Sequence, residues 1–407
     1  MGDVKTLCRE AAERIEKVHI APFLGMKDPV FLISDTYPGV WLEHVYDSVF
    51  YALQHPERVD VAIHTLHLFI DRQKEDGQLP FCVLNGAKVN RPPEKLAGYS
   101  QIQECVSFAR LCYMVCGQVE DRNLLEWCYE ACAKWVNWIA AHRMTTGRGL
   151  TEMFVGYDTG HDNSSRLAGL TCDGLYAVDG VAQNAAILPP NDPVAPIGAV
   201  DMSCNYYGNL ITLAKMAREL GREEEANAWD QRAKDVKQAL FAHCYDREDA
   251  FFYDVDKNGR KRKYLSSTIF HLFIEEVLDP EEDKALIEEI YTRHIKNPAE
   301  FWTEYPFPSM AMNDPSIEGH KDNNCWGYYS QGLIALRATL WMDRYGFGRD
   351  MDYLCEKWVQ AWTKHSDKVR FGQELDPITG VPTACSQYYS SCMLFYLYAA
   401  KRLGMDA

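Results

Sequence analysis

The residues best suited to chemistry lie in one polar stretch, Gly156-Tyr157-Asp158-Thr159-Gly160-His161-Asp162-Asn163-Ser164-Ser165-Arg166. No apolar period runs through it, so it is neither an amphipathic helix nor a half-buried strand. Its glycines and its Asp, Asn and Ser content are typical of a loop, although the same residue types also cap helices. We interpret it as a loop at the mouth of a pocket, with Asp162 as the candidate catalytic carboxyl. Candidate substrate-binding residues in it are Asp158, His161, Asn163 and Arg166.

A second carboxylate, Glu374, precedes a turn far down the chain. Paired carboxylates suit glycoside hydrolysis, because one protonates the leaving oxygen while the other activates water or attacks the sugar. The acid must hold its proton near neutral pH, so we expect burial or a neighbouring carboxylate such as Asp158 to raise the pKa of Asp162. The sequence contains no Gly-x-Ser-x-Gly elbow, no phosphate-binding Gly-x-x-x-x-Gly-Lys and no His-Glu-x-x-His.

Two further regions, 41–48 and 301–309, combine polar and aromatic residues that a plain helical bundle does not need. Aromatic side chains this dense suit stacking on the apolar faces of sugar rings, although core packing is the usual fate of a Trp. Asp47 could accept a hydrogen bond from a sugar hydroxyl, or it could simply favour the dipole of the helix it opens. The candidate substrate-binding residues here and just beyond are Trp41, Asp47, Trp302, Tyr305 and Trp326.

The elements that must position these residues are helices, because apolar residues recur at three- and four-residue spacing. Short turns join neighbouring helices into pairs, and long loops separate the pairs. Long loops in a compact domain are usually functional. This alternation predicts an all-α fold, an (α/α)6 barrel of six helical hairpins with its long loops on one mouth. We expect helices over about 3–19, 41–55, 57–74, 100–117, 121–142, 201–220, 223–241, 266–275, 280–294, 327–345, 350–364 and 386–403.

Composition does not shift along the chain and no repeat of fixed period is present, so we predict a single catalytic domain over 1–407 rather than an open solenoid. The stretch 245–265 predicts a small β-hairpin with an Asn-Gly turn. Asp254, Asp256 and Asn258 also mimic the start of a calcium loop. Leu265 stands where such a loop needs a bidentate Glu, so we expect neither a metal nor a cofactor.

The charge balance excludes some partners. Lys and Arg number 42 against 58 Asp and Glu, which gives a net charge of −16 and disfavours nucleic acid. The dense basic run 260–263 is interpreted as a solvated turn. No apolar stretch resembles a secretory signal or a membrane span. The 14 cysteines fall on helix-like segments without a CxxC, so we expect reduced, buried thiols and a cytoplasmic protein.

The polar regions, in this order, resemble the catalytic domain of glycoside hydrolase family 63 and its trehalase-like relatives over about 35–400. Thr159-Gly160-His161-Asp162-Asn163-Ser164-Ser165-Arg166 is similar to the family's Ser-Gly-Met-Asp-Asn-Ser-Pro-Arg, whose Asp is the general acid. Glu374-Leu375-Asp376-Pro377-Ile378-Thr379-Gly380 is similar to Glu-Asn-Tyr-x-Pro-x-Thr-Gly, whose Glu is the general base. Weaker matches are Val45-Tyr46-Asp47-Ser48 to Trp-Asp-Ser, 73–80 to Gln-x-x-Asp-Gly-x-Ile-Pro, and Gln101 to the Gln of Gln-Pro-Pro, which adds Gln101 to the substrate-binding candidates.

The resemblance implies an inverting α-glycosidase with Asp162 as acid and Glu374 as base, whose carboxyl groups then lie roughly 6.5–9.5 Å apart. The chain departs from the family at Trp326-Gly327, which lacks an intervening Arg, and at Tyr389, where Trp is usual. These positions line the sugar site in the family, so they bear on which sugar is bound. The compact length resembles small cytoplasmic members that cleave glucosylglycerate or mannosylglycerate. We therefore expect a small α-linked glucoside or mannoside as substrate, with His161 and Arg166 favouring an acidic or polar aglycone.

Two alternatives remain open on the sequence alone. A sugar epimerase or isomerase of the N-acylglucosamine 2-epimerase type uses a barrel of the same kind and length, but it would need a pair of basic histidines in its cavity. The second alternative is a carbohydrate-binding protein without catalytic activity. Incubation with α-glucosides and α-mannosides distinguishes the three classes by released sugar, isomerised sugar or no product.

Overall fold

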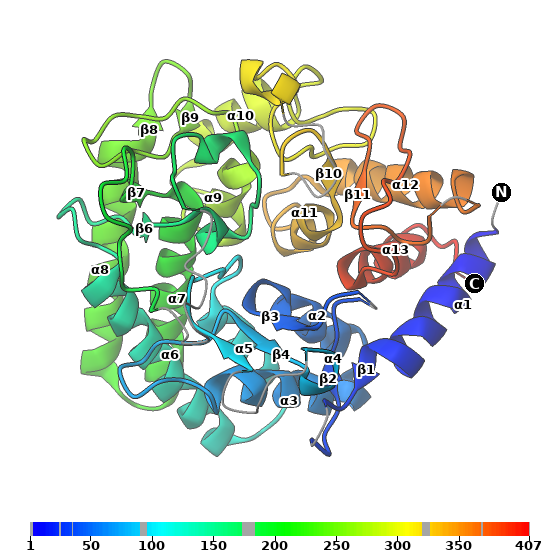
Figure 1. Ribbon diagram of the computed structural model, residues 1–407, viewed down its shortest axis with the longest axis horizontal. Coiled ribbons are helices and arrows are strands. Elements are labelled where there is room, and N and C mark those ends of the chain that lie inside the picture. The colour runs from blue at the N-terminus through cyan, green and yellow to red at the C-terminus, as the bar shows by residue number, and fades with distance from the viewer. Residues whose placement is uncertain are drawn as a thin grey trace.

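The computed structural model describes residues 3–23, 26–34, 36–89, 96–172, 184–319, 326–367 and 369–406. Helices dominate it and lie in two layers around a common centre (Figure 1). The inner layer contains α2 (Val45–Gln54), α5 (Phe108–Cys116), α7 (Val200–Glu219), α9 (His271–Ile274), α11 (Gly332–Arg337) and α13 (Ser390–Arg402). The outer layer contains α1 (Val4–Arg14), α3 (Val59–Ile70), α6 (Arg122–His142), α8 (Glu223–Ala239), α10 (Lys284–Ile290) and α12 (Gly348–Lys364).

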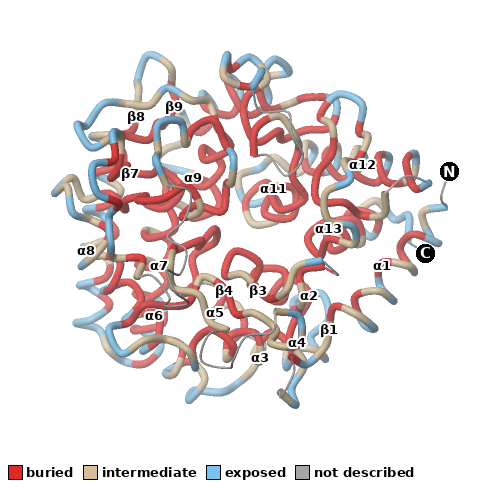
Figure 2. Tube along the Cα trace, viewed as in Figure 1, coloured by how far each residue is buried: buried red, intermediate tan, exposed pale blue. Residues whose placement is uncertain are grey.

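Neighbouring inner helices pack side by side, α2 on α5, α5 on α7, α7 on α9, and α13 on both α11 and α2. Each inner helix follows an outer one in the chain, so the helices alternate between layers as the sequence pattern predicts. Burial follows the same division, because the inner helices are buried along most of their length while the outer ones expose one face (Figure 2). The apolar stripe of an outer helix therefore covers the inner layer, which is the usual arrangement of stacked helices.

Helix ends agree with the sequence signals where a cap is present. Asp121 caps α6, with its carboxylate accepting from the backbone N–H of Asn123 at 2.9 Å and of Leu124 at 3.2 Å. Asp3 caps α1 in the same way through Thr6. Such a cap satisfies amides that have no partner within the helix. The predicted boundaries of these two helices and of α7, α8 and α12 lie within two residues of the observed α-helices once the π-helical turn at Ile15–His19 is counted with α1.

Several predicted helices are too long, and two of them differ most from the structure. The segment expected from residue 100 becomes helical only at Phe108, because Gln103 adopts φ +54° and its amide donates to the Asp158 carbonyl at 2.8 Å. The segment expected over 327–345 contains the strand β10 (Ser330–Gln331) and the short α11. In both places tertiary contacts near the centre of the ring override local helical spacing.

Short antiparallel strands tie the loops together rather than forming a large sheet. They are β1 (Ile20–Ala21) with β2 (Val30–Phe31), β3 (Gly39–Trp41) with β4 (Cys82–Leu84) and β5 (Ala97–Gly98), β6 (Glu152–Met153) with β7 (Ile197–Gly198), β8 (Tyr245–Asp246) with β9 (Phe251–Phe252), and β10 with β11 (Glu374–Leu375). The last pair matters most for function, because it places Gln331 directly opposite Glu374. The remaining short element, α4 (Gly86–Val89), follows β4.

The predicted hairpin is confirmed. Val255 and Lys261 pair in antiparallel fashion, and Gly259 adopts φ +79° in the turn between them. The Asp256 carboxylate accepts from the amides of Asn258 and Arg260, which caps the turn. In the described parts of the chain, no group of three His, Cys, Asp or Glu side chains is arranged to hold a metal ion.

The described cysteines are all free thiols, and most are buried, as the sequence predicts. Cys112 of α5 and Cys132 of α6 bring their sulfur atoms to 3.8 Å in the interface between the two helices. Within the described ranges, none of the helices combines the length and the apolar character that crossing a bilayer requires.

Candidate active site

The Asp162 loop connects two short 3-10 turns, Gly156–Thr159 and Ser165–Leu167. Gly160 ends the first turn at φ +71°, and a Cβ added there would lie 2.4 Å from the Glu43 Oε2 atom. Glycine is therefore required both by the backbone conformation and by the close approach of Glu43. Asp162 follows at the surface of this cluster, half-buried, and its carbonyl accepts from the Trp326 amide at 3.2 Å. Asn163, the next residue, is exposed and has φ +60°.

Asp158 anchors the loop from within. Its buried carboxylate accepts from the amides of Phe154 at 2.8 Å, Val155 at 3.0 Å and Ile102 at 3.1 Å, and it forms an ion pair with Arg143. These contacts occupy both carboxylate oxygens and neutralise the charge. Asp158 therefore holds the loop in place, and it does not supply the uncompensated negative charge beside Asp162 that we expected of it.

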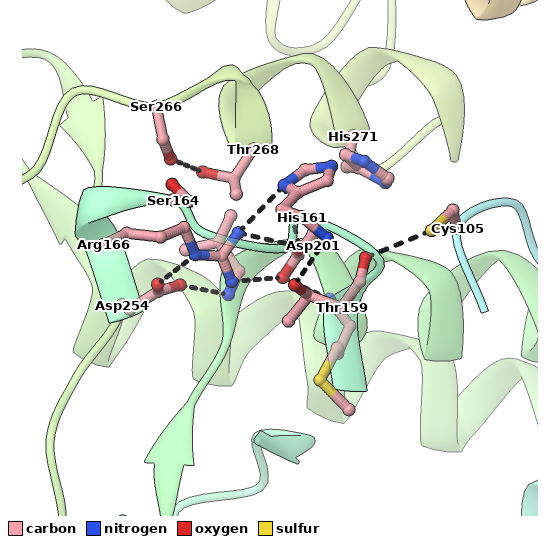
Figure 3. Close-up of polar contacts among 12 residues, drawn as sticks. Cys105, Thr159, His161, Ser164, Arg166, Asp201, Asp254, Ser266, Thr268 and His271 are labelled. Atoms are coloured by element: carbon pink, nitrogen blue, oxygen red, sulfur yellow. Dashed lines mark hydrogen bonds and ion pairs between the residues drawn. The ribbon is translucent and has the colours of Figure 1, made fainter. Parts of the chain in front are cut away.

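Arg166 is likewise committed to internal contacts (Figure 3). Its guanidinium binds both oxygens of Asp201 on α7 at 2.8 and 3.0 Å, and its Nε lies 3.0 Å from the Asp254 carboxylate. The side chain is only 1 % exposed. Burial acts to raise the pKa of Asp201, but attraction from Arg166 outweighs it and holds that pKa well below its usual range. The charge of Arg166 is thus balanced inside the protein, and we assign it to fixing the loop on α7 rather than to an acidic aglycone.

His161 extends from the same loop toward His271 (Figure 3). Its ring stacks on Trp326 with centroids 4.3 Å apart and meets the edge of His271 at 6.0 Å. The imidazole also lies 3.8 Å from Asp201. Burial lowers the pKa of His161 well below its usual value and that of His271 to about 4. Both rings are therefore neutral near neutral pH, so they offer hydrogen bonds rather than charge.

Glu374 lies on β11 and is fully buried. Its Oε2 accepts from the Gln331 side-chain amide at 2.9 Å, and its Oε1 accepts from the Thr383 hydroxyl at 2.9 Å. Tyr305 supports the following loop, because its amide donates to the Pro377 carbonyl and its ring covers Gly380. The carboxylate is thus fixed in orientation by donors on both sides, as a general base requires.

Asp162 and Glu374 both act electrostatically on Tyr37. Burial raises the pKa of the Tyr37 hydroxyl, and the negative charges of Glu43, Asp162 and Glu374 all raise it further. Both candidate catalytic carboxylates therefore lie within electrostatic range of one phenol. Tyr37 itself donates to the Gln373 side chain at 3.3 Å and packs edge-on against Trp41 at 5.2 Å.

Glu43 is a third carboxyl at this centre. Burial raises its pKa from 4.5 to about 8, the Arg337 charge opposes that shift, and Asp162 adds to it. The Cys105 thiol contacts its Oε2 at 3.7 Å, and the His44 imidazole lies 3.4 Å from its Oε1. Glu43 is thus the carboxyl that interacts with Asp162, the role that the sequence suggested for Asp158.

Asp47 and Gln101 are buried near the same inner helices. The Asp47 carboxylate accepts from the hydroxyls of Ser390 and Ser391 on α13, and burial raises its pKa to about 6. The Gln101 amide donates to the Gln103 side chain at 3.2 Å. Asp47 therefore links α2 to α13.

Trp302 lies apart from this cluster in the contacts of the described residues. Its ring stacks on Tyr353 of α12 at 5.5 Å and meets Phe307 at 5.6 Å, with Lys296 over its face. Phe307 in turn packs on Phe270. Trp302 therefore packs against the outer helix α12 and Phe307 packs beside the inner helix α9, so these aromatics serve core packing, the ordinary use of such side chains.

Sequence reasoning missed Tyr37, Glu43, His271, Gln331 and Arg337. Glu43 and Asp47 are spaced four residues apart, which is a weak sign of a shared helical face. The other four carry no local pattern, because their importance comes from where the fold places them. Arg337 supplies a buried cation at the centre, and its guanidinium donates to the Glu43 carbonyl at 3.3 Å.

Comparison with known proteins identifies the family and the fold that the chain resembles. A family profile described as the mannosylglycerate hydrolase MGH1-like glycoside hydrolase domain matches residues 37–389. Among solved structures, the GH63 mannosylglycerate hydrolase from Thermus thermophilus in complex with glucose superposes with a TM-score of 0.72 at 17 % identity, covering 96 % of this chain and 99 % of that one. Neutral trehalase Nth1 from Saccharomyces cerevisiae gives 0.68 at 15 % identity, covering 92 % and 73 %. No curated protein sequence matches the chain significantly.

Proposed function

The chain belongs to the mannosylglycerate hydrolase MGH1-like glycoside hydrolase family, and we propose that it is an inverting α-glycosidase acting on a small α-linked glucoside or mannoside. The observation that carries the proposal is that Asp162 and Glu374, from loops far apart in sequence, both lie within electrostatic range of the Tyr37 hydroxyl. Two carboxyl groups facing one sugar ring are the minimum that glycoside hydrolysis needs. Membership in the family makes the protein a glycoside hydrolase, and the catalytic roles are our assignment.

Asp162 is assigned as the general acid. Its backbone is fixed by Trp326, and the loop that bears it is held by the Asp158–Arg143 and Arg166–Asp201 ion pairs. Glu43 lies within electrostatic range of it as a second acidic group. Two neighbouring carboxyls share protons because like charges disfavour joint ionisation, which helps Asp162 to remain protonated until it protonates the leaving oxygen.

Glu374 is assigned as the general base. Hydrogen bonds from Gln331 and Thr383 stabilise its ionised form and aim it. In the inverting reaction it takes a proton from a water molecule that attacks the anomeric carbon as the bond to the aglycone breaks and Asp162 donates its proton. Neutral His161, stacked on Trp326, is positioned to orient sugar hydroxyls.

We base the proposed substrate on a structurally similar enzyme, and not on the charge of Arg166. One solved structure of the Thermus thermophilus mannosylglycerate hydrolase, which shares 15 % identity with this chain, carries Tris and D-glycerate. A three-carbon acid as aglycone would be consistent with a compact chain. Because the charge of Arg166 is balanced by Asp201 and Asp254, we assign recognition of such an acid to other groups around the loop.

The fold that we propose is a closed (α/α)6 barrel forming one domain over 1–407, with the loops of Asp47, Asp162, Trp302 and Glu374 on one mouth. The alternating inner and outer helices and their side-by-side packing support it. Trp302, which packs against α12, is expected at the rim rather than at the sugar.

A panel of α-glucosides and α-mannosides, including mannosylglycerate and glucosylglycerate, tests the function. We expect released sugar, with turnover of disaccharide-sized substrates and not of long glycans alone. Isomerised sugar would instead support the epimerase alternative, for which His161 and His271 provide the pair of imidazoles. No product with any sugar would support a binding protein.

Two variants test the roles. Asp162→Asn should abolish turnover of substrates with poor leaving groups and spare glycosyl fluorides, which need no protonation. Glu374→Gln should impair turnover of both kinds of substrate, because the attacking water loses its base whichever leaving group is present. Glu356→Gln, at an exposed position on α12, is the matched control and should leave both activities unchanged. Equal loss on fluorides for Asp162→Asn would contradict the assignment.

A further inference from the structure

A surface pocket of about 480 Å³ opens beside the Asp162 loop, outside the catalytic cluster. It is formed by the turn of the hairpin, which carries the basic run 260–263, and by the segment around Asp314. Arg262 donates to the carbonyls of Arg166 and Ala168 at 2.9 and 2.5 Å, and Ser316 bonds to Ser165 at 2.7 Å. The pocket wall is therefore in direct contact with the segment that follows Asp162.

The two acidic side chains of this pocket already accept hydrogen bonds from their own loops. Asp314 accepts from the Leu265 amide at 2.8 Å and from the amide and hydroxyl of Ser316. Asp256 accepts from two amides of the hairpin turn. Each of these carboxylates stabilises its own loop, and neither forms a salt bridge with an arginine of the pocket within the described residues.

The basic side chains divide into two groups. The Lys263 ammonium is paired with Asp249 at 2.8 Å and Asp246 at 3.2 Å, and Lys261 lies 3.6 Å from Asp246. Arg260 is exposed, and like Arg262 it has no salt-bridge partner in the part of the chain that the structure describes. The lining itself holds four basic and two acidic side chains, and the two arginines are its cations that lack an ion-pair partner among the described residues.

The pocket also has an aromatic wall. The Arg262 guanidinium lies 5.6 Å from the centroid of the half-buried Tyr264 ring. Guanidinium groups bind carboxylate and phosphate through paired N–H donors, and an aromatic face packs on the apolar face of a sugar. The volume lies within the range usual for small-molecule sites.

We propose that this pocket binds a sugar bearing a carboxylate or phosphate group, with Arg260 and Arg262 contacting the oxyanion and Tyr264 contacting the ring. The site is separate from the catalytic carboxylates, so the inference does not depend on the proposed function. Its position against 165–168 would hold an acidic saccharide next to the Asp162 loop.

Isothermal titration calorimetry of the intact protein tests the site with glucuronate, glucose 6-phosphate, glucose and inorganic phosphate. We expect both acidic sugars to bind more tightly than glucose and than phosphate alone, and a lower affinity at higher salt. Arg260→Met should weaken the acidic sugars about tenfold, because an exposed charge-assisted contact is lost. Lys263→Met, which removes an equal charge that is already paired, should change the affinity less than about twofold.

The outcomes separate the alternatives. Binding of either acidic sugar more tightly than glucose supports the site, and the tighter of the two identifies which anion it takes. Equal effects of Arg260→Met and Lys263→Met, or acidic sugars binding no better than glucose, would overturn the proposal. Phosphate binding as tightly as glucose 6-phosphate would contradict the role of Tyr264. Both variants should keep the melting temperature and the glycosidase activity of the parent, since neither residue is in the catalytic cluster.

Discussion

Replacing Glu43 with Gln should make the protein more stable, by an amount that grows with pH. The pKa of Glu43 rises from 4.5 to about 8 in the folded state, mainly through burial. The folded state therefore holds this proton more tightly than the unfolded chain does. The resulting stabilisation is fully present below pH 4.5 and is lost as the pH rises through about 8. An uncharged amide of the same shape escapes that loss.

The magnitude follows from the two pKa values. At 1.36 kcal/mol per pKa unit, the difference amounts to at most roughly 5 kcal/mol above pH 8 and about 3 kcal/mol at pH 7. With an unfolding entropy of about 2.1 cal/mol/K per residue, a chain of 407 residues shifts its Tm by about 1 °C per kcal/mol. Glu43→Gln should thus raise Tm by about 3 °C at pH 7 and about 5 °C at pH 9, with no change at pH 4.

Differential scanning fluorimetry across pH 4–9 measures this directly, with Glu356→Gln as the exposed control. The same variant should move the alkaline limb of the kcat/KM profile to lower pH, because Asp162 loses the neighbouring carboxyl that shares its proton. A Tm difference that is constant with pH, or an alkaline limb that does not move, would refute the assignment of Glu43 as a protonated partner of Asp162.

Three further results are expected. Arg143→Met should lower the free energy of unfolding by about 3–5 kcal/mol in chemical denaturation, because it leaves the buried Asp158 carboxylate unpaired, and adding Asp158→Asn should restore part of it. Gln331→Ala should reduce kcat about 10- to 100-fold with little change in KM in steady-state assays, because Glu374 loses a donor that orients it; a change in KM alone would contradict this. Among the described cysteines, the partly exposed Cys172 and Cys385 should react with a thiol reagent in the native protein and the buried ones only after unfolding.

The sequence predicts most of the helices because periodicity and capping are local properties. Asp121 and the apolar spacing of α6 define that helix without reference to anything else. The prediction is wrong over 100–107, where contacts with Asp158 and Glu275 replace helical hydrogen bonds. Those contacts come from distant parts of the chain, so no local pattern could reveal them.

The candidate site likewise contains residues that local motifs reveal and residues that only the fold brings together. Asp162 and Glu374 stand in short motifs, so sequence resemblance finds them. Arg337 stands in no such motif. It lies on α11, and only the packing of the helices places its guanidinium near Glu43. It nevertheless places a guanidinium at the centre, although the Arg that the family pattern expects between Trp326 and Gly327 is missing.

The stereochemistry of the first product tests the central claim most directly. Proton NMR during hydrolysis of an α-glycoside should show the β-anomer of the released sugar first, with the α-anomer appearing only through mutarotation. This result follows if Glu374 activates water on the face opposite the leaving group. Initial release of the α-anomer would mean retention, would make Glu374 a nucleophile, and would contradict the assigned roles of both carboxylates.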